Sequence, residues 1–366
     1  MTTKDTVGYT LSGGNAHALD LLEQALHQFR CFADNPLATA EAALAEAPDL
    51  VMAQVLRAWL YLLSSEAAAV APAREALAAA RELPHNEREA WHLRAIAQLC
   101  DGHWRAAALT LEDLSVHYPL DALALQAGQQ LDFFVGDARM LRDRIARALP
   151  AWSATLPGWH AVLGMQAFGL EETGDYARAE RLGRQAVDLQ PRDAWAQHAV
   201  AHVLEMQGRR DEGIEWMRGN EGWQTDNFLA VHNWWHLALF HIEFDLNVIA
   251  GLMAVIGYSL NDSIVISDRL RDLLGSRTRM GIHECSDVAI KATFSRTMIT
   301  SGTTLFTVGA LLLFGGDALY GFSFTLFAGI LVGTISSITV ASTVQELLGL
   351  SPQAYQKKEE ELAEAA

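Results

Sequence analysis

Cysteine is scarce throughout this sequence, and tryptophan and histidine are almost absent from its last third. The three cysteines, Cys31, Cys100 and Cys285, show no metal-site or redox-motif spacing, so we expect buried thiols in a reducing compartment. All ten tryptophans and twelve of the thirteen histidines lie at or before residue 241. Eight of the nine prolines lie before residue 192. This break in composition predicts a domain boundary near residue 243.

Positive charge is also in deficit. Residues 244–366 hold 8 Lys and Arg against 12 Asp and Glu, a net charge of −4, so the total of −17 leaves −13 for residues 1–243. Such an acidic first part argues against nucleic acid as a partner. The opening residues Met-Thr-Thr-Lys-Asp lack the apolar core of a signal peptide, so we expect residues 1–243 to begin in the cytoplasm.

Residues 1–243 contain a regular spacing of proline and glycine among Ala- and Leu-rich helical patterns. The steps are 36, 35, 38 and 34 residues for proline and 34, 38 and 34 for glycine, at Pro48, Pro84, Pro119, Pro157 and Pro191 and at Gly102, Gly136, Gly174 and Gly208. A repeat of this length predicts helix-turn-helix units in which Gly makes the inner turn and Pro follows the second helix. Because such units bury their apolar faces only against neighbours, we predict a curved helical solenoid.

The clearest repeat unit extends from about His160 to Pro191 and contains Gly174-Asp175-Tyr176. It resembles a tetratricopeptide repeat. With the later stretch from His198 to Gly213 and the segment His232-Asn233-Trp234-Trp235-His236, residues 5–243 resemble the bacterial relatives of tetratricopeptide repeat protein 38. This resemblance implies a scaffold whose groove holds a protein or peptide ligand, and it implies no settled biochemical activity.

Four histidines and one glutamate of this part are candidate metal ligands. His198 and His202 lie four residues apart on one predicted helix face, Glu205 follows three residues later, and His232 and His236 repeat the spacing. Two such pairs on facing helices would supply imidazole ligands to a metal ion. The alternative is a polar seam in which histidines and tryptophans bond each other and nearby carboxylates, since the HExxH general base is missing. We expect no other cofactor.

Three apolar runs follow, each long enough to cross a bilayer. Their charge is confined to one aspartate, Asp262, and they occupy residues 246–267, 297–316 and 318–344. About 20 apolar residues span the hydrocarbon core, so we predict three transmembrane helices within a domain of residues 244–350. The arginine-rich segment 268–296 is predicted to be a short cytoplasmic loop, and residues 351–366 a charged cytoplasmic tail.

Several short motifs in this part occur in the order and spacing of one family. They include Gly257-Tyr258-Ser259-Leu260-Asn261-Asp262, Ser267-Asp268-Arg269, Thr300-Ser301-Gly302-Thr303-Thr304 and Gly333-Thr334-Ile335-Ser336-Ser337. Residues 237–355 strongly resemble the C-terminal part of SecF, a protein-export membrane protein that works with SecD beside the SecYEG channel. The resemblance implies a multi-pass protein of the bacterial inner membrane that couples the proton gradient to translocation.

By this resemblance, Asp262 matches the transmembrane aspartate of the proton path, and Arg296 matches the arginine at the mouth of the next helix. An Asp at a helix centre costs roughly 2.5–3.5 kcal/mol on insertion scales, so it is retained where it faces a bundle interior, an ion path or a partner charge. The alternatives are a helix-packing hydrogen bond with Asn261 and Ser259, and a snorkelling role for Arg296. The supporting motif also includes Gly257, Tyr258, Asp268 and Arg269.

Two features differ from a complete SecF. The family has six transmembrane helices and a large exported domain after the first, whereas a helical array here replaces the first three. Three spans with the basic loop and the tail inside would also place residue 244 outside, which conflicts with a cytoplasmic first half. We interpret the chain as a chimera joined near Leu237–Glu243, a stretch that fits both families. Amplifying codons 230–255 from source DNA tests whether the join is an artefact.

The predicted fold class is therefore all-α, a tetratricopeptide-like solenoid followed by three SecF-type transmembrane helices. Our main hypothesis is a SecF-like component of the export machinery that retains only the C-terminal part. The alternatives are a repeat scaffold tethered to the membrane without transport activity, and a soluble enzyme that uses the histidine cluster. We expect no enzymatic activity, and we expect the chain alone to fail in a SecF-depleted strain because the proton path needs the missing helices and SecD.

Overall fold

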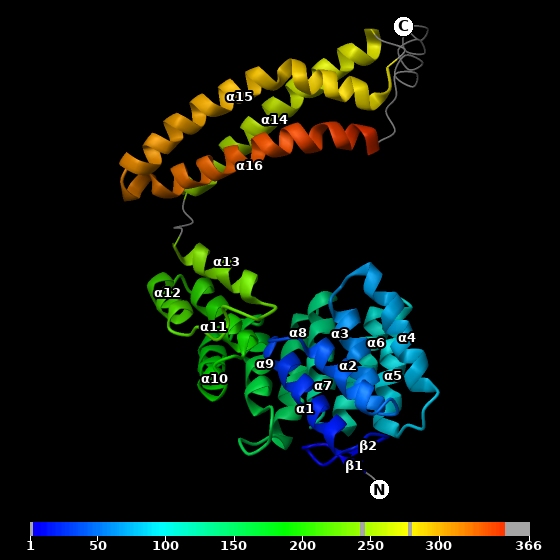
Figure 1. Ribbon diagram of the computed structural model, residues 1–366. Coiled ribbons are helices and arrows are strands. Elements are labelled where there is room, and N and C mark those ends of the chain that lie inside the picture. The colour runs from blue at the N-terminus through cyan, green and yellow to red at the C-terminus, as the bar shows by residue number, and fades with distance from the viewer. Residues whose placement is uncertain (1–2, 242–245, 277–279, 348–366) are drawn as a thin grey trace. The chain divides into compact units, whose positions relative to one another are not determined.

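The computed structural model describes residues 3–241, 246–276 and 280–347. The chain divides into two compact units, Met1–His241 and Ile242–Ala366. Apart from one short hairpin and an isolated bridge, the regular structure of the described residues is helical, which confirms the all-α fold class (Figure 1). The predicted boundary at residues 243 and 244 and the predicted tail of residues 351–366 lie outside the described residues.

The first unit begins with a two-stranded antiparallel hairpin, Thr3–Lys4 (β1) and Thr10–Leu11 (β2), and continues as a succession of helices (Figure 1). The helices are α1 (Ala16–Cys31), α2 (Pro36–Glu46), α3 (Val51–Leu63), η1 (Ala67–Ala69), α4 (Val70–Arg81), α5 (Glu87–Cys100), α6 (Trp104–His117), α7 (Ala122–Phe134), α8 (Ala138–Ala148), η2 (Leu149–Ala151), α9 (Trp159–Glu171), α10 (Tyr176–Leu189), α11 (Ala194–Met206), α12 (Arg210–Arg218) and α13 (Ala230–His241). The largest apolar core is formed mainly by side chains of α1 to α7 and includes the fully buried Trp59.

Four helix pairs turn at the glycines whose spacing defines the repeat. The pairs are α5–α6, α7–α8, α9–α10 and α11–α12, and their turns contain Gly102, Gly136, Gly174 and Gly208 with φ between +67° and +82°. Glycine adopts this left-handed conformation without the steric cost of a Cβ atom. The helix-turn-helix pairs predicted from the spacing are therefore present, while membership of the tetratricopeptide repeat family stays a prediction.

Buried aspartates tie neighbouring pairs together. Asp121 caps α7 by accepting a hydrogen bond from Ala124 N, and its other oxygen lies 3.0 Å from His92 Nε2 of α5. Asp193 caps α11 in the same way and lies 2.8 Å from His160 Nδ1 of α9. The contact between a helix cap and a histidine thus recurs two pairs later, which fits an internal repeat.

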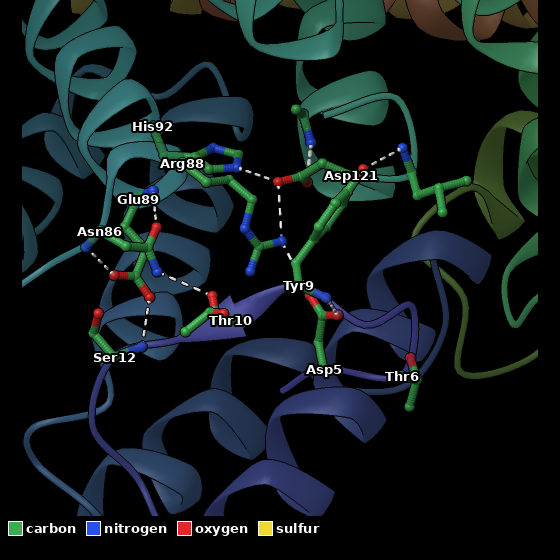
Figure 2. A network of polar contacts seen from close by, with 12 residues as sticks. Asp5, Thr6, Tyr9, Thr10, Ser12, Asn86, Arg88, Glu89, His92 and Asp121 are labelled. Carbon is green, nitrogen blue, oxygen red and sulfur yellow. Dashed lines mark hydrogen bonds and ion pairs between the residues drawn. The ribbon is translucent and has the colours of Figure 1, made fainter. Parts of the chain in front are cut away.

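Figure 2 shows how the N-terminal hairpin is joined to α5 and α7. Arg88 of α5 lies between two carboxylates, with its Nη1 atom 3.0 Å from Asp5 Oδ2 and 3.3 Å from Asp121 Oδ2. Glu89 accepts a hydrogen bond from the chain just after β2, and Asn86 donates one to the backbone of β2. The network therefore fixes the N-terminal hairpin and the residues that flank it against the helical array.

We expect an acid-dependent loss of stability that depends on Asp121. Burial opposes ionisation of this carboxyl, but the charges of His92 and Arg88 outweigh burial and hold its pKa well below the usual range. A pKa lowered by folding stabilises the folded state above the unfolded value of 3.8, and this contribution is lost as the pH falls through the folded-state pKa. Thermal unfolding of the chain and of its Asp121→Asn variant should therefore differ most near neutral pH and converge in acid. A constant difference across this range would argue against the assignment.

The second unit consists of three long helices, α14 (Leu246–Ser276), α15 (Ile282–Phe314) and α16 (Asp317–Leu347), and each contacts the other two (Figure 1). All three contain a segment long and apolar enough to cross a membrane. Large apolar side chains such as Leu246, Phe306 and Val332 are exposed on their outer faces. The described residues therefore contain the three long apolar helices that the sequence predicts.

The prediction that residues 268–296 form a basic loop is wrong for most of this segment. Residues 268–276 continue α14, and residues 282–296 form the first half of α15. Two physical causes favour helix here. Leu270, Leu273 and Leu274 pack against Cys285 and Ala289 in a small core, and charged side chains pair three residues apart on the outer face, Asp268 with Arg271 and Arg269 with Asp272.

Candidate functional site

Asp262 lies in the interior of the three-helix unit. Its side chain on α14 is 5% exposed, and its Oδ2 atom is buried without a hydrogen-bond partner among the described residues. Ser259 and Ile266, one turn away on either side, are also partly or fully buried, whereas Asn261 is exposed. An ionisable group on the inner face of an apolar helix is a functional-site hypothesis by default.

Hydroxyl groups connect the three helices one turn from Asp262. Tyr258 OH of α14 donates to Ser301 Oγ of α15 at 2.9 Å, and Ser301 Oγ lies 2.9 Å from Thr334 Oγ1 of α16. Ser337 Oγ of α16 lies 3.3 Å from the carbonyl oxygen of Ser259. Polar contacts in an apolar bundle fix the register of the helices. These contacts therefore fix the position of Asp262 along the bundle relative to α15 and α16.

Arg296 has an exposed side chain on α15 and lies within electrostatic reach of Asp262. No direct ion pair joins these two side chains in the described part of the chain. The structure thus brings Asp262, Tyr258 and Ser259 to the helix interface. It leaves the other motif residues on the outer face, namely Gly257, Asn261, Asp268 and Arg269.

Small residues allow α14 and α16 to approach closely. A methyl group added at Gly329 of α16 would overlap the side chain of Val255, and one added at Gly333 would contact Ser259. We expect Gly329→Ala to lower the stability of the three-helix unit by about 1–3 kcal/mol, the usual cost of overpacking. Gly302→Ala is a matched control because nothing lies within 4 Å of a methyl group there. Thermal unfolding in detergent measures both, and equal effects would contradict the packing.

The candidate metal ligands of the first unit meet between α11 and α13. His232 Nε2 lies 2.9 Å from His198 Nε2 and 3.1 Å from His236 Nε2. One nitrogen from each of the four histidines, His202 included, falls within 4.8 Å of the other three. His198 and His236 are buried, whereas His232 is exposed. The two pairs predicted from their spacing therefore do face each other.

Two carboxylates contact this cluster. Glu205 Oε2 lies 2.8 Å from His236 Nδ1, and Glu171 Oε2 of α9 lies 3.5 Å from His202 Nδ1. The sequence prediction included Glu205 but missed Glu171, because nothing in the spacing of α9 indicates that it faces α11. Burial, followed by the charges of neighbouring histidines, lowers the pKa of His198 well below its ordinary value, and it also lowers the pKa of His232.

Comparison with known proteins matches the C-terminal part of the chain to one family. Residues 231–350 match the family described as "Protein export membrane protein SecD/SecF, C-terminal". This match confirms the resemblance to SecF predicted from the motifs. It begins at Val231, inside α13, and so includes His232 and His236 but neither histidine of α11.

Several bacterial proteins named protein translocase subunit SecF are similar to this part. The protein of Escherichia coli O157:H7 is 50% identical over 130 residues, which cover 35% of this chain and 40% of the relative. The Rhodothermus marinus protein is 45% identical over 117 residues, covering 32% of this chain and 37% of the relative. The Pseudomonas aeruginosa protein is 44% identical over 117 residues, with 32% and 38% covered. The chain thus spans about two fifths of the length of these relatives.

Proposed function

We propose that residues 246–347 act as the C-terminal half of a SecF-type subunit in protein export across the bacterial inner membrane. The observation that carries this proposal is Asp262, a carboxyl group held inside a three-helix unit whose sequence matches the SecD/SecF C-terminal family. The partners proposed by likeness are SecD and the SecYEG channel.

In this proposal Asp262 gains and loses a proton during the export cycle. A carboxyl group inside an apolar bundle is neutral when protonated, and its charged form needs a nearby cation or water. Arg296, exposed on α15, supplies a cation within electrostatic reach of this carboxyl group. The hydroxyl groups of Tyr258, Ser301 and Thr334 hold the helices in register around the carboxyl.

The relatives are longer than the matched stretch, so the proposed activity requires the missing part. We expect the chain to support export in SecF-depleted cells when the N-terminal half of SecF and SecD are supplied alongside it. The measurement is the rate at which a secretory precursor is processed. The Asp262→Asn variant should lose this support, whereas Asp272→Asn, an exposed change on the same helix, should keep it.

The alternative function is a repeat scaffold tethered to the membrane, in which the first unit binds a protein or peptide. A tether needs three apolar helices but no buried carboxyl group. The same assay separates the two functions, because equal export by the unmutated chain and by its Asp262→Asn variant would favour the tether. Failure of the chain to support export even with both missing components present would refute the export proposal.

A further inference from the structure

Hydrogen bonding alone does not satisfy the histidines between α11 and α13. A neutral imidazole has one N–H group and one lone pair. His236 Nδ1 faces the Glu205 carboxylate at 2.8 Å, so Nδ1 carries the hydrogen and Nε2 keeps the lone pair. His232 Nε2 faces this lone pair at 3.1 Å and also His198 Nε2 at 2.9 Å. One N–H on His232 serves only one of these two neighbours.

His202, the fourth histidine, has one ring nitrogen that lacks a hydrogen-bond partner among the described residues. Its Nδ1 atom faces Glu171, while its Nε2 atom is buried and has no hydrogen bond within the described part of the chain. Its ring centroid lies 4.2 Å from that of His198 and 4.7 Å from that of His236. Buried polar atoms are normally satisfied, so an orphan nitrogen beside three crowded imidazoles indicates a cation-binding site.

We propose that His198, His202, His232 and His236 bind one divalent transition-metal ion of the zinc class. Tetrahedral Zn–N bonds of about 2.0–2.1 Å place neighbouring nitrogens about 3.3 Å apart. The distances of 2.9 and 3.1 Å between the Nε2 atoms are close to this spacing. Imidazole favours zinc, copper, iron and nickel over calcium and magnesium, which prefer oxygen ligands.

The surroundings of the four histidines fit metal binding. Glu205 accepts a hydrogen bond from His236 Nδ1 at 2.8 Å, and a carboxylate in this position fixes the tautomer and orientation of a ligating histidine. Glu171 lies 3.5 Å from His202 Nδ1 and places a second negative charge beside the cluster. The exposed His232 gives an ion access from solvent.

A second cluster, His27, Cys31 and His160, is less suited to a metal. Burial raises the pKa of the Cys31 thiol to about 12, so an ion there would first have to displace a tightly held proton. The Nδ1 atom of His160 is taken by Asp193 at 2.8 Å. The four-histidine cluster is therefore the site to which we assign the ion.

Metal binding would fasten α13 to α11. His232 and His236 belong to the stretch that matches the SecF family, whereas His198 and His202 lie before it. The site lies wholly within the first unit but combines two residues inside the matched stretch with two outside it. It is independent of the export proposal, because none of its ligands lies in α14, α15 or α16.

The test uses the full chain purified in detergent, stripped with a chelator and then titrated with Zn²⁺ or Co²⁺. We expect one metal ion per chain by elemental analysis and the visible absorption of tetrahedral Co²⁺. His232→Gln should weaken binding more than about 100-fold while leaving the circular dichroism unchanged, because His232 is exposed. Glu205→Gln should weaken binding by about 10- to 100-fold. His85→Gln, the loss of an exposed histidine on a loop, is the matched control and should bind as before.

Two results would overturn the assignment. The first is a folded chain that takes up no metal ion above the level of the His232→Gln variant. The second is binding that survives the combined His232→Gln and His236→Gln changes, which would place the ion elsewhere. Loss of that binding with Cys31→Ser would then locate it at the second cluster. A rise in the melting temperature of the unmutated chain with Zn²⁺, absent in His232→Gln, supports the assignment.

Discussion

Replacing Asp132 with alanine is expected to destabilise the first unit by about 3 kcal/mol, the lower end of the usual cost of breaking a buried ion pair, because Glu112 still pairs with Arg144. Asp132 of α7 accepts two hydrogen bonds from Arg144 of α8, from Nε at 2.7 Å and from Nη2 at 2.9 Å. Arg144 is 1% exposed and also donates to the carbonyl oxygen of Ala108 in α6. The pair thus joins three consecutive helices, and its loss leaves a buried guanidinium group whose remaining charged partner is Glu112, 3.2 Å from Nη1.

Thermal unfolding of the full chain in detergent measures this effect. A loss of about 3 kcal/mol corresponds to roughly 6–12 °C in the melting temperature of a unit of this size. Asp143→Ala is the matched control, because Asp143 pairs with Arg142 on the same helix α8 but on its exposed side. Exposed ion pairs contribute little, so the control should melt close to the unmutated chain. Equal melting temperatures for the two variants would show that the buried pair does not hold the helices together.

Replacing Asp262 with leucine should improve membrane insertion of the α14 segment while abolishing its part in export. On insertion scales an Asp at a helix centre costs about 2.5–3.5 kcal/mol and a Leu is favourable by about 0.3–0.6 kcal/mol. The sum corresponds to a gain of roughly 100-fold or more in the insertion equilibrium. A variant with higher membrane insertion of α14 and lower export activity would show that the Asp262 carboxyl group serves export rather than insertion.

Glycosylation mapping of residues 246–276 in a host membrane protein measures insertion, and the precursor-processing assay measures export. Asp268→Leu provides a control nearer the charged end of α14, where Asp268 already pairs with Arg271 at 2.5 Å. Its gain in insertion should be smaller because the cost of a charge falls toward the membrane surface. An Asp262→Leu variant that supports export as well as the unmutated chain would contradict the proton-path role.

The periodic features of the sequence predicted much of the fold. Glycine at a fixed spacing located four turns, because a positive φ at Gly102 or Gly174 is a local requirement that the sequence records directly. Uninterrupted apolar runs located the three long helices for a similar reason. A loop is predicted from the sequence where the structure has the C-terminal end of α14 and the first half of α15, because the charges of Arg269 and Arg271 suggest solvent exposure. The helical spacing of Leu270, Leu273 and Leu274 on the opposite face is the signal that would have predicted helix there.

In the candidate sites, too, the sequence predicts which residues share one helix face but not which helices come into contact. The spacing of His198 with His202 and of His232 with His236 placed each pair on one helix face. The approach of α11 to α13, and the contact of Glu171 from α9, depend on tertiary packing that no spacing encodes. Similarly, the sequence identifies the motif around Asp262 but not the direction in which each of its residues faces. Only the packing of the helices shows that Asp262 is buried while Asn261 and Gly257 are exposed.

The proposed function requires that the three apolar helices around Asp262 hold the chain in the membrane, while the helical array before them is soluble in water. The most direct test introduces a protease site after His241, cleaves the chain in isolated membranes, and washes them at alkaline pH. We expect the fragment containing α14 to α16 to stay in the membrane pellet and the fragment containing α1 to α13 to be released with its helical circular dichroism. Release of both fragments together, as one water-soluble body, would contradict the account.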